Sequence, residues 1–397
     1  MKKLISFVLC LSLVASLVAC GGQNVQSSSN ETNSAPSSAP SSASATYKIG
    51  GIGPITGGAA IYGLAVQRGI QIAIDEINAN GGIGGYKVEY RFEDDEHDAE
   101  KAVNAYNVLK GWGMQALIGT TTSSPCIAVA AESSMDNLFQ ITPSGSAVEC
   151  VDNDTVFRVC FSDPDQGAAS AKFINDKKLA KKVGVIYDSS DVYSSGVREK
   201  FAEEAKKCDF EIVETTEFTA DTKTDFTTQL QKLKSAGAEL VFMPFYYSEA
   251  AIVLTQASTM DYKPIFFGVD GLDGLLTVEN FDLNLAEGVM LLTPFVADAN
   301  DSLTQNFVNT YKKLYNEVPN QFAADSYDAA YIVKAALEDG NANPNMSYSE
   351  LCDILKESML NIKVNGLTGQ NMTWDESGEP KKDPKAVIIK NGVYVGA

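Results

Sequence analysis

Histidine is nearly absent from this sequence, because His97 is the only one among 397 residues. Histidine-rich metal sites need several imidazole ligands, so the composition excludes them. A Ser/His/Asp or Cys/His catalytic triad would have to use His97 alone. The G-x-S-x-G motif of α/β hydrolases is also missing from the chain. We therefore expect no enzyme activity and no cofactor or metal.

Basic residues are scarce relative to acidic ones: 31 Lys and Arg oppose 51 Asp and Glu, for a formal net charge of −20. Such a chain is repelled by nucleic acid and by anionic lipid headgroups. Nucleic acid is therefore excluded as a partner.

Long apolar runs are limited to the N-terminus, where residues 4–19 follow Lys2 and Lys3. This run is too short for a membrane span and is typical of a secretory signal. It ends in Leu17-Val18-Ala19-Cys20, which resembles the bacterial lipoprotein signal. The resemblance implies cleavage of a signal peptide (residues 1–19) and acylation of Cys20, whose lipid chains would anchor the protein to the cell membrane on its extracytoplasmic side.

A polar tether follows the predicted lipidation site. Residues 27–46 are rich in Ser, Ala and Pro and contain no aromatic residue and no aliphatic residue larger than Ala. Such a segment cannot bury enough apolar surface to offset its conformational entropy. We expect residues 20–46 to be a disordered tether and the folded part to begin near Tyr47.

Five cysteines remain after Cys20, and none has the C-x-x-C spacing of a zinc or redox site. An odd number leaves at least one thiol unpaired. We expect buried free thiols, although Cys150 and Cys160 could close a small loop. The five are Cys126, Cys150, Cys160, Cys208 and Cys352.

Short β-rich runs alternate with amphipathic stretches along almost the whole chain. The predicted strands are residues 48–54, 88–93, 116–119, 139–142, 182–187, 211–217, 240–244, 264–268 and 289–293. Helical periodicity is present in residues 61–77, 99–109, 197–207, 226–235, 303–315 and 323–337. This alternation predicts an α/β fold of parallel sheets covered by helices on both faces, and the length favours two doubly wound lobes.

Ligands of open parallel sheets bind beyond the carboxyl ends of the strands. The segments that follow the predicted strands are rich in hydroxyls, glycines and aromatic residues. They include residues 53–62, 119–125, 143–146, 188–193, 245–247 and 269–271.

Two segments at the ends of predicted strands superficially resemble other kinds of binding site but do not match their motifs. Gly51-x-Gly53-x-x-x-Gly57 does not fit the G-x-G-x-x-G dinucleotide fingerprint, since position 56 is Thr. The acidic run of residues 93–98 lacks the spaced ligands of a calcium loop. We expect its last carboxylate, Asp98, to cap the following helix, and we expect His97 to be solvated.

Several motifs together resemble the leucine/isoleucine/valine-type periplasmic binding proteins. The resemblance covers essentially residues 47–397 and implies two doubly wound lobes joined by three crossovers, which close over a ligand. The motifs are Gly53-Pro54-x-Thr56-Gly57, Asp75-Glu76-Ile77-Asn78-x-x-Gly81-Gly82-Ile83-x-Gly85, Asp94-Asp95-x-x-Asp98-x-x-x-Ala102-Val103, Ile118-Gly119, Thr142-Pro143, Arg158-x-x-x-x-Asp163-x-x-Gln166-Gly167, Tyr246-Tyr247 and Thr373-Trp374-Asp375-x-x-Gly378.

The same resemblance implies a binding site for an amino acid. The carboxylate positions fall on Ser123 and Ser146, and the ammonium positions fall on the Ser144 carbonyl region and Asp270. Aromatic cleft positions fall on Tyr62, Tyr193 and Tyr246, and Asp163 lies near the hinge side of the cleft. Taken singly, these serines could be turn or N-cap residues and the tyrosines could be packing residues.

Physical chemistry agrees with these implied roles. Hydroxyls and backbone N–H groups at a helix that starts near Ser124-Pro125 suit a carboxylate. An ammonium needs a carboxylate partner such as Asp270. Relatives tend to have Ala-Thr where this chain has Gly145-Ser146, and often Glu at Asp270, so the particular amino acid stays open.

The resemblance implies a substrate-binding lipoprotein of an ABC importer for an amino acid of the branched-chain type, acting as a monomer with the permease subunits as partners. A ligand-sensing receptor component for an amide, peptide or other solute is the alternative. We expect an N-terminal lobe of residues 47–164 plus 295–365 and a C-terminal lobe of residues 165–294 plus 366–397.

Overall fold

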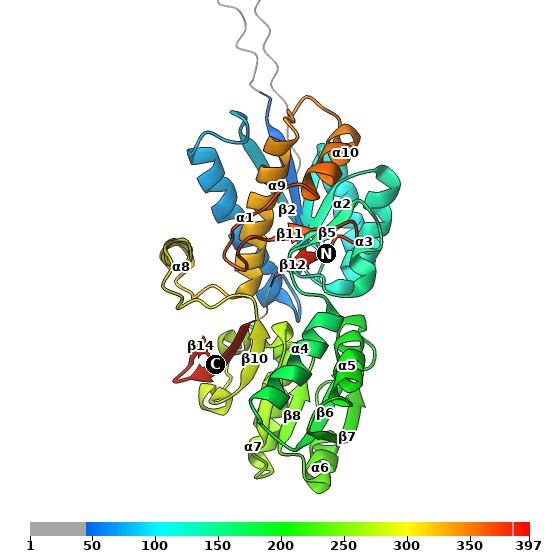
Figure 1. Ribbon diagram of the computed structural model, residues 1–397, viewed down its shortest axis with the longest axis vertical. Coiled ribbons are helices and arrows are strands. Elements are labelled where there is room, and N and C mark those ends of the chain that lie inside the picture. Colours follow the sequence, from blue (N-terminus) through cyan, green and yellow to red (C-terminus); the bar gives the residue numbers. More distant parts are fainter. Residues whose placement is uncertain (1–44, 383–384) are drawn as a thin grey trace, which may run out of the picture. The chain divides into compact units, whose positions relative to one another are not determined.

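The computed structural model of this chain describes residues 45–382 and 385–397. The predicted signal peptide, Cys20 and nearly all of the predicted tether lie outside the described residues. The described part belongs to one unit, Ser44–Ala397, which contains two separate main sheets (Figure 1).

The first sheet is entirely parallel. In spatial order its strands are β2 (Val88–Asp94), β1 (Tyr47–Gly53), β3 (Ala116–Gly119), β4 (Gln140–Thr142) and β5 (Val156–Arg158). Neighbouring residues of one strand point to opposite faces. Leu117 accordingly packs in a cluster with the helices on one face, and Ile118 packs in the cluster on the other.

Helices cover both faces of this sheet. On one face α1 packs along α9, and on the other α2 packs on α3 (Figure 1). α8 contacts α1, and α10 contacts α9. Their bounds are α1 (Ala60–Ala79), α2 (Ala99–Trp112), α3 (Ser123–Asp136), α8 (Ser302–Tyr315), α9 (Gln321–Asp339) and α10 (Tyr348–Met359).

The second sheet is parallel except at one edge, where β13 pairs antiparallel with both β10 and β14. In spatial order its strands are β7 (Glu211–Phe218), β6 (Lys182–Asp188), β8 (Leu240–Met243), β9 (Ile265–Gly268), β10 (Met290–Thr293), β13 (Lys385–Lys390) and β14 (Val393–Gly396). Phe242 packs toward α4 (Asp163–Asp176) and α5 (Val192–Ala205), and Val241 packs in the cluster that holds α6 (Thr227–Ala236) and α7 (Tyr247–Thr259). Each sheet thus lies between two helix layers, and the predicted α/β fold of two doubly wound lobes is confirmed.

The segment after α10 contacts the first sheet and its helices. The backbone N–H groups of Leu367 and Thr368 donate to the Asp328 carboxylate of α9 at 2.8 and 2.9 Å. The Trp374 indole of β11 (Thr373–Trp374), which pairs with β12 (Pro380–Lys381), donates to the Arg158 carbonyl at 2.8 Å. We therefore propose that the N-terminal lobe extends to about residue 378, beyond the expected boundary at 365.

Candidate ligand-binding site

Seven of the eight residues expected to bind ligand line one small cavity. They come from the loops at the carboxyl ends of strands in both sheets, together with α1 and α5. The cavity has a volume of only about 10 Å³, enough for about one water molecule. A ligand of amino-acid size therefore requires the walls to move apart. The seven are Tyr62, Ser123, Ser144, Ser146, Tyr193, Tyr246 and Asp270.

Serine hydroxyls join two neighbouring loops on one side of the cavity. The Ser123 Oγ accepts hydrogen bonds from the backbone N–H groups of Ser146 and Ala147, both at 3.2 Å. The Ser144 hydroxyl donates to the Thr121 carbonyl at 2.6 Å. These bonds hold the β3 and β4 loops in a fixed register, so the hydroxyls serve the structure as well as any ligand.

The N-terminus of α3 opens at the same place. Its N-cap residue, Thr122, lines the cavity but makes no side-chain capping hydrogen bond. The first N–H groups of a helix have no acceptor within the helix, and the helix dipole favours an anion there. The Thr121 hydroxyl, buried at the cavity wall, has no protein hydrogen-bond partner. This side of the cavity is suited to a carboxylate.

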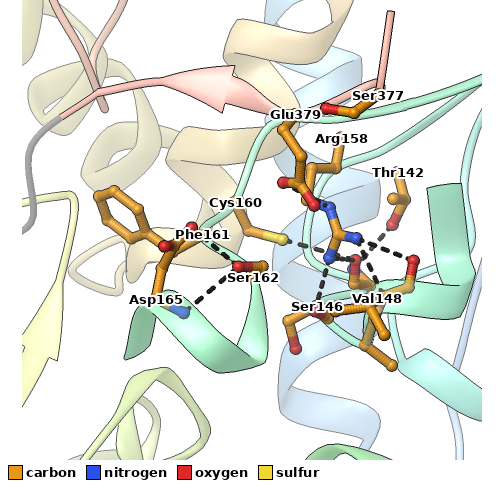
Figure 2. Close-up of polar contacts among 12 residues, drawn as sticks. Thr142, Ser146, Val148, Arg158, Cys160, Phe161, Ser162, Asp165, Ser377 and Glu379 are labelled. Atoms are coloured by element: carbon orange, nitrogen blue, oxygen red, sulfur yellow. Dashed lines mark hydrogen bonds and ion pairs between the residues drawn. The ribbon is translucent and has the colours of Figure 1, made fainter. Parts of the chain in front are cut away.

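A buried arginine fixes the loop of residues 143–147, called the serine loop below, from behind. The Arg158 guanidinium donates to the four carbonyl oxygens of residues 145–148 at 3.2, 2.5, 3.0 and 3.4 Å (Figure 2). Its Nε lies 3.1 Å from the Glu379 carboxylate. One side chain thus satisfies four successive carbonyls, and the planar fork of arginine allows this where lysine would not. Although Arg158 is in a motif of the family resemblance, sequence reasoning gave it no role.

Asp270 provides the negative charge on the other side of the cavity. It lies in a 3₁₀ turn, Asp270–Leu272, directly after β9. One carboxylate oxygen accepts from the Tyr193 hydroxyl at 2.7 Å and the other from the Gln166 amide at 2.9 Å. Burial raises the pKa of Asp270 to about 6, although these two hydrogen bonds act in the opposite direction. Both donors are neutral, so they leave the charge of this carboxylate uncompensated.

Aromatic rings form the remaining wall. Tyr193 and Tyr246 stack with ring centres 5.2 Å apart, and Tyr62 lies edge-on to Tyr246 at 5.6 Å. Phe322, at the start of α9, packs on Tyr62 at 4.2 Å and also lines the cavity. Such a wall suits an apolar ligand group, and the ring faces also attract cations.

Tyr62 also connects the two lobes. Its hydroxyl donates to the Gly271 carbonyl, and it accepts from the Tyr247 N–H at 3.2 Å. The Tyr247 hydroxyl in turn donates to the Gly58 carbonyl at 2.8 Å. These contacts join the loop after β1 and the helix α1 to loops of the second sheet. The lobes are therefore in contact across the site.

Asp163, the eighth residue, does not line the small cavity but lies next to it. Its backbone N–H donates to the Ser146 carbonyl at 2.9 Å, and one of its buried carboxylate oxygens has no protein partner. Burial raises the pKa of Asp163 well above its usual range, while a hydrogen bond from Ser146 lowers it. The structure thus places Asp163 at the junction between the serine loop and α4.

His97, which we expected to be solvated, is half-buried. Its ring lies edge-on to Tyr246 with centres 5.5 Å apart, and its Nδ1 is 2.9 Å from the Thr122 hydroxyl. Burial lowers the pKa of His97, and nearby Asp191 opposes that shift. The positive φ angles of Glu96 and His97 turn the loop inward, and no local sequence pattern signalled this. Asp98, by contrast, caps α2 as expected, accepting from the Lys101 N–H.

Sequence reasoning did not single out Thr121, Thr122, Gly271 and Phe322 as cavity residues. The first three lie in the strand-end segments 119–125 and 269–271, where a ligand was expected, whereas Phe322 comes from a helix distant in sequence. A larger cavity of about 1300 Å³ also borders Asp270, but none of the other expected residues lines it. We place the site in the small cavity, where the hydroxyls, the aromatic rings and the carboxylate converge.

Two further features concern the described residues as a group. Across residues 45–382 and 385–397, His, Cys, Asp and Glu side chains do not gather in threes as they would to hold a metal ion. Within the same ranges, no helix has the length and apolar character needed to cross a membrane.

Comparison with known proteins decides the family. A family model described as periplasmic binding protein matches residues 46–388. The chain belongs to this family. Its fold and its strand-end site agree with that membership, and the family is extracytoplasmic, as the N-terminal signal predicts.

Similar curated proteins have related names. Leu/Ile/Val-binding protein homolog 3 of Brucella melitensis is 28% identical over 300 residues, which cover 75% of this chain and 80% of that protein. The leucine-, isoleucine-, valine-, threonine-, and alanine-binding protein of Pseudomonas aeruginosa is 26% identical over 344 residues, covering 86% and 89%.

Solved structures of binding proteins with related names are similar to this chain in fold. The branched-chain amino acid transporter substrate binding protein LivJ of Streptococcus pneumoniae, in complex with isoleucine, has a TM-score of 0.80 and 29% identity, covering 88% of this chain and 97% of its own. A leucine binding protein of Thermotoga maritima has a TM-score of 0.78 and 26% identity, covering 89% and 98%.

Proposed function

We propose that this periplasmic binding protein captures a branched-chain amino acid between its two lobes and delivers it to the permease of an ABC importer. It acts as a monomer, held at the outer face of the cell membrane by lipid on Cys20. The name of the similar Streptococcus pneumoniae structure, a transporter substrate binding protein, supports a transport role over a sensing role.

The observation that carries the proposal is the charge pattern of the cavity. Asp270 is a buried carboxylate whose two partners, Tyr193 and Gln166, are both neutral. A buried charge is costly unless it is paired, so the site gains most from a cationic ligand group. The open N-terminus of α3 and the Thr121 hydroxyl favour an anionic group. An α-amino acid carries both groups on a single carbon atom.

The aromatic wall sets the preference for the ligand side chain. Tyr62, Tyr193, Tyr246 and Phe322 present ring surface to the cavity. Burial of an aliphatic side chain against such a wall is worth about 1.5 to 3 kcal/mol. A branched aliphatic amino acid therefore combines the two charged ends with an apolar group that this wall accepts.

Binding and lobe closure are coupled in this arrangement. The carboxylate side belongs to loops of the first sheet, and Asp270 belongs to the second. Only the closed form brings both sets to one ligand, so the ligand shifts the open–closed equilibrium toward that form. The closed form is then the one that the permease receives.

A thermal-shift screen with matched ligands tests the proposal. Leucine, isoleucine and valine are compared with 4-methyl-2-oxopentanoate, which lacks the ammonium, and with 3-methylbutylamine, which lacks the carboxylate. We expect the amino acids to stabilise the protein by about 2.7 kcal/mol at a hundredfold excess over Kd, and both analogues to stabilise it far less. Equal stabilisation by the keto acid, or none by any α-amino acid, would overturn the proposal.

A further inference from the structure

Two cysteine thiols lie directly behind the serine loop. Cys126 is in the first turn of α3, and Cys150 is in the 3₁₀ turn Val148–Val151 that follows the loop. Both are fully buried. They form one small apolar cluster with Ala147, and both are free thiols in this structure.

Surrounding polar groups hold the two thiols in place. The Cys150 Sγ lies 3.7 Å from the Ser123 carbonyl, which belongs to the same helical turn as Cys126. The Gln140 amide nitrogen of β4 lies 3.6 Å from the Cys126 Sγ. Cys160, the partner that the sequence left open for Cys150, instead directs its thiol to the Gly145 carbonyl at 3.6 Å. The structure thus points to Cys126 as the partner of Cys150.

We infer that Cys126 and Cys150 are a redox pair that forms a disulfide when the chain folds outside the cytoplasm in contact with a disulfide-bearing oxidant. The Cys126 thiolate attacks one sulfur of the oxidant, forms a mixed disulfide and releases the first thiol. The Cys150 thiolate then attacks the Cys126 sulfur and releases the second. Two cysteine thiols are oxidised, the oxidant disulfide is reduced to two thiols, and the two cysteine protons pass to these leaving groups.

The location of the pair sets when the bond forms and what it does. Since both sulfurs are inaccessible in the folded protein, oxidation precedes the packing of α3 on the 3₁₀ turn. The bond joins the turn that carries Ser123 to the segment after Ala147. The Ser123 hydroxyl already accepts from the Ser146 and Ala147 N–H groups. A covalent link therefore braces the loop that, under the proposed function, receives the ligand carboxylate.

Peptide mapping tests the inference. The mature chain (residues 20–397) carrying Cys20→Ser is refolded with reduced and oxidised glutathione, alkylated in denaturant and digested for mass spectrometry. We expect a linked pair of peptides containing Cys126 and Cys150, and alkylated Cys160, Cys208 and Cys352. The oxidised protein should melt on the order of 5 °C above the dithiothreitol-treated protein, because the bond restricts the unfolded chain.

Two matched variants serve as controls. Cys150→Ala should abolish the melting difference and leave Cys126 alkylated, whereas Cys160→Ala should preserve both the bond and the difference. Alkylation of Cys126 and Cys150 after oxidative refolding, or a Cys150–Cys160 link, would overturn the inference. A mapped bond without a melting difference would overturn the bracing role. The mapping uses no amino acid, so its failure is distinct from failure of the proposed function.

Discussion

Replacing Asp270 with Asn separates the charge of this residue from its shape. The amide oxygen can still accept from Gln166, and the amide nitrogen can donate to the Tyr193 oxygen, so both neighbours keep a partner. No cavity is created. The main change is the loss of one buried negative charge.

This change should act on binding and on stability in opposite directions. Removing one partner of a buried charged pair costs about 2 to 5 kcal/mol, or roughly 30- to 5000-fold in affinity. In the unliganded protein, burial raises the pKa of Asp270 from 3.8 to about 6. The ionised form is thus disfavoured on folding by about 3 kcal/mol. The variant should therefore resist urea better than the parent at pH 8, by up to that amount.

Asp273→Asn is the matched control. Asp273 is also buried, with its pKa raised to about 7, but it accepts from the Gln321 N–H and does not line the small cavity. Calorimetric titration of leucine and urea unfolding are run on both variants. The control should gain stability and keep its affinity. Affinity of Asp270→Asn within threefold of the parent, or an equal loss in both variants, would refute the ammonium assignment.

Four more outcomes are expected. Burial raises the pKa of Asp270 to about 6, so its contribution to the free energy of unfolding is full below pH 3.8 and lost above about pH 6. The free protein should therefore resist urea better at pH 5 than at pH 8. Leucine affinity, measured by calorimetry, should instead fall below about pH 6. Arg158→Lys should lower unfolding free energy by about 2 to 4 kcal/mol in urea, since lysine cannot serve the carbonyls of residues 145–148; an unchanged midpoint would contradict this. Ser123→Ala should cost about 1 to 2 kcal/mol of affinity, much less than the loss of Asp270. Cys20→Ser should move the protein from the membrane to the soluble fraction, and a soluble parent would refute lipidation.

Much of the fold was predictable because parallel strands leave strong local signals. The runs predicted at residues 116–119 and 182–187 correspond to β3 and β6 within one residue. Since such strands end at the same edge of a sheet, residues that follow them converge. Ser123 and Ser144 follow neighbouring strands of the first sheet and were expected together for this reason. Asp270 follows a strand of the second sheet, and its place in the same site was implied by the family resemblance. The structure brings all three together.

Other elements were missed for identifiable reasons. α5 begins at Val192, five residues before the predicted start, because its first turn contains Ser and Gly and has no apolar period. The antiparallel hairpin of β13 and β14 turns at Asn391-Gly392, both at positive φ, and this dipeptide was a usable signal. The role of Arg158 depends on carbonyls of a loop that only tertiary packing brings to it.

The hydroxyl of Tyr62 has a consequence for the transport cycle. It forms its hydrogen bonds to Gly271 and Tyr247 through protein groups alone. Under the proposed function, these bonds favour closure without any ligand, so we expect a fraction of unloaded molecules to adopt the form that the permease receives. Those molecules compete with loaded ones for the same docking surface. The rate of import then depends on the ratio of loaded to unloaded protein. Tyr62→Phe would lower the fraction of unloaded protein in the closed form and would also weaken ligand binding.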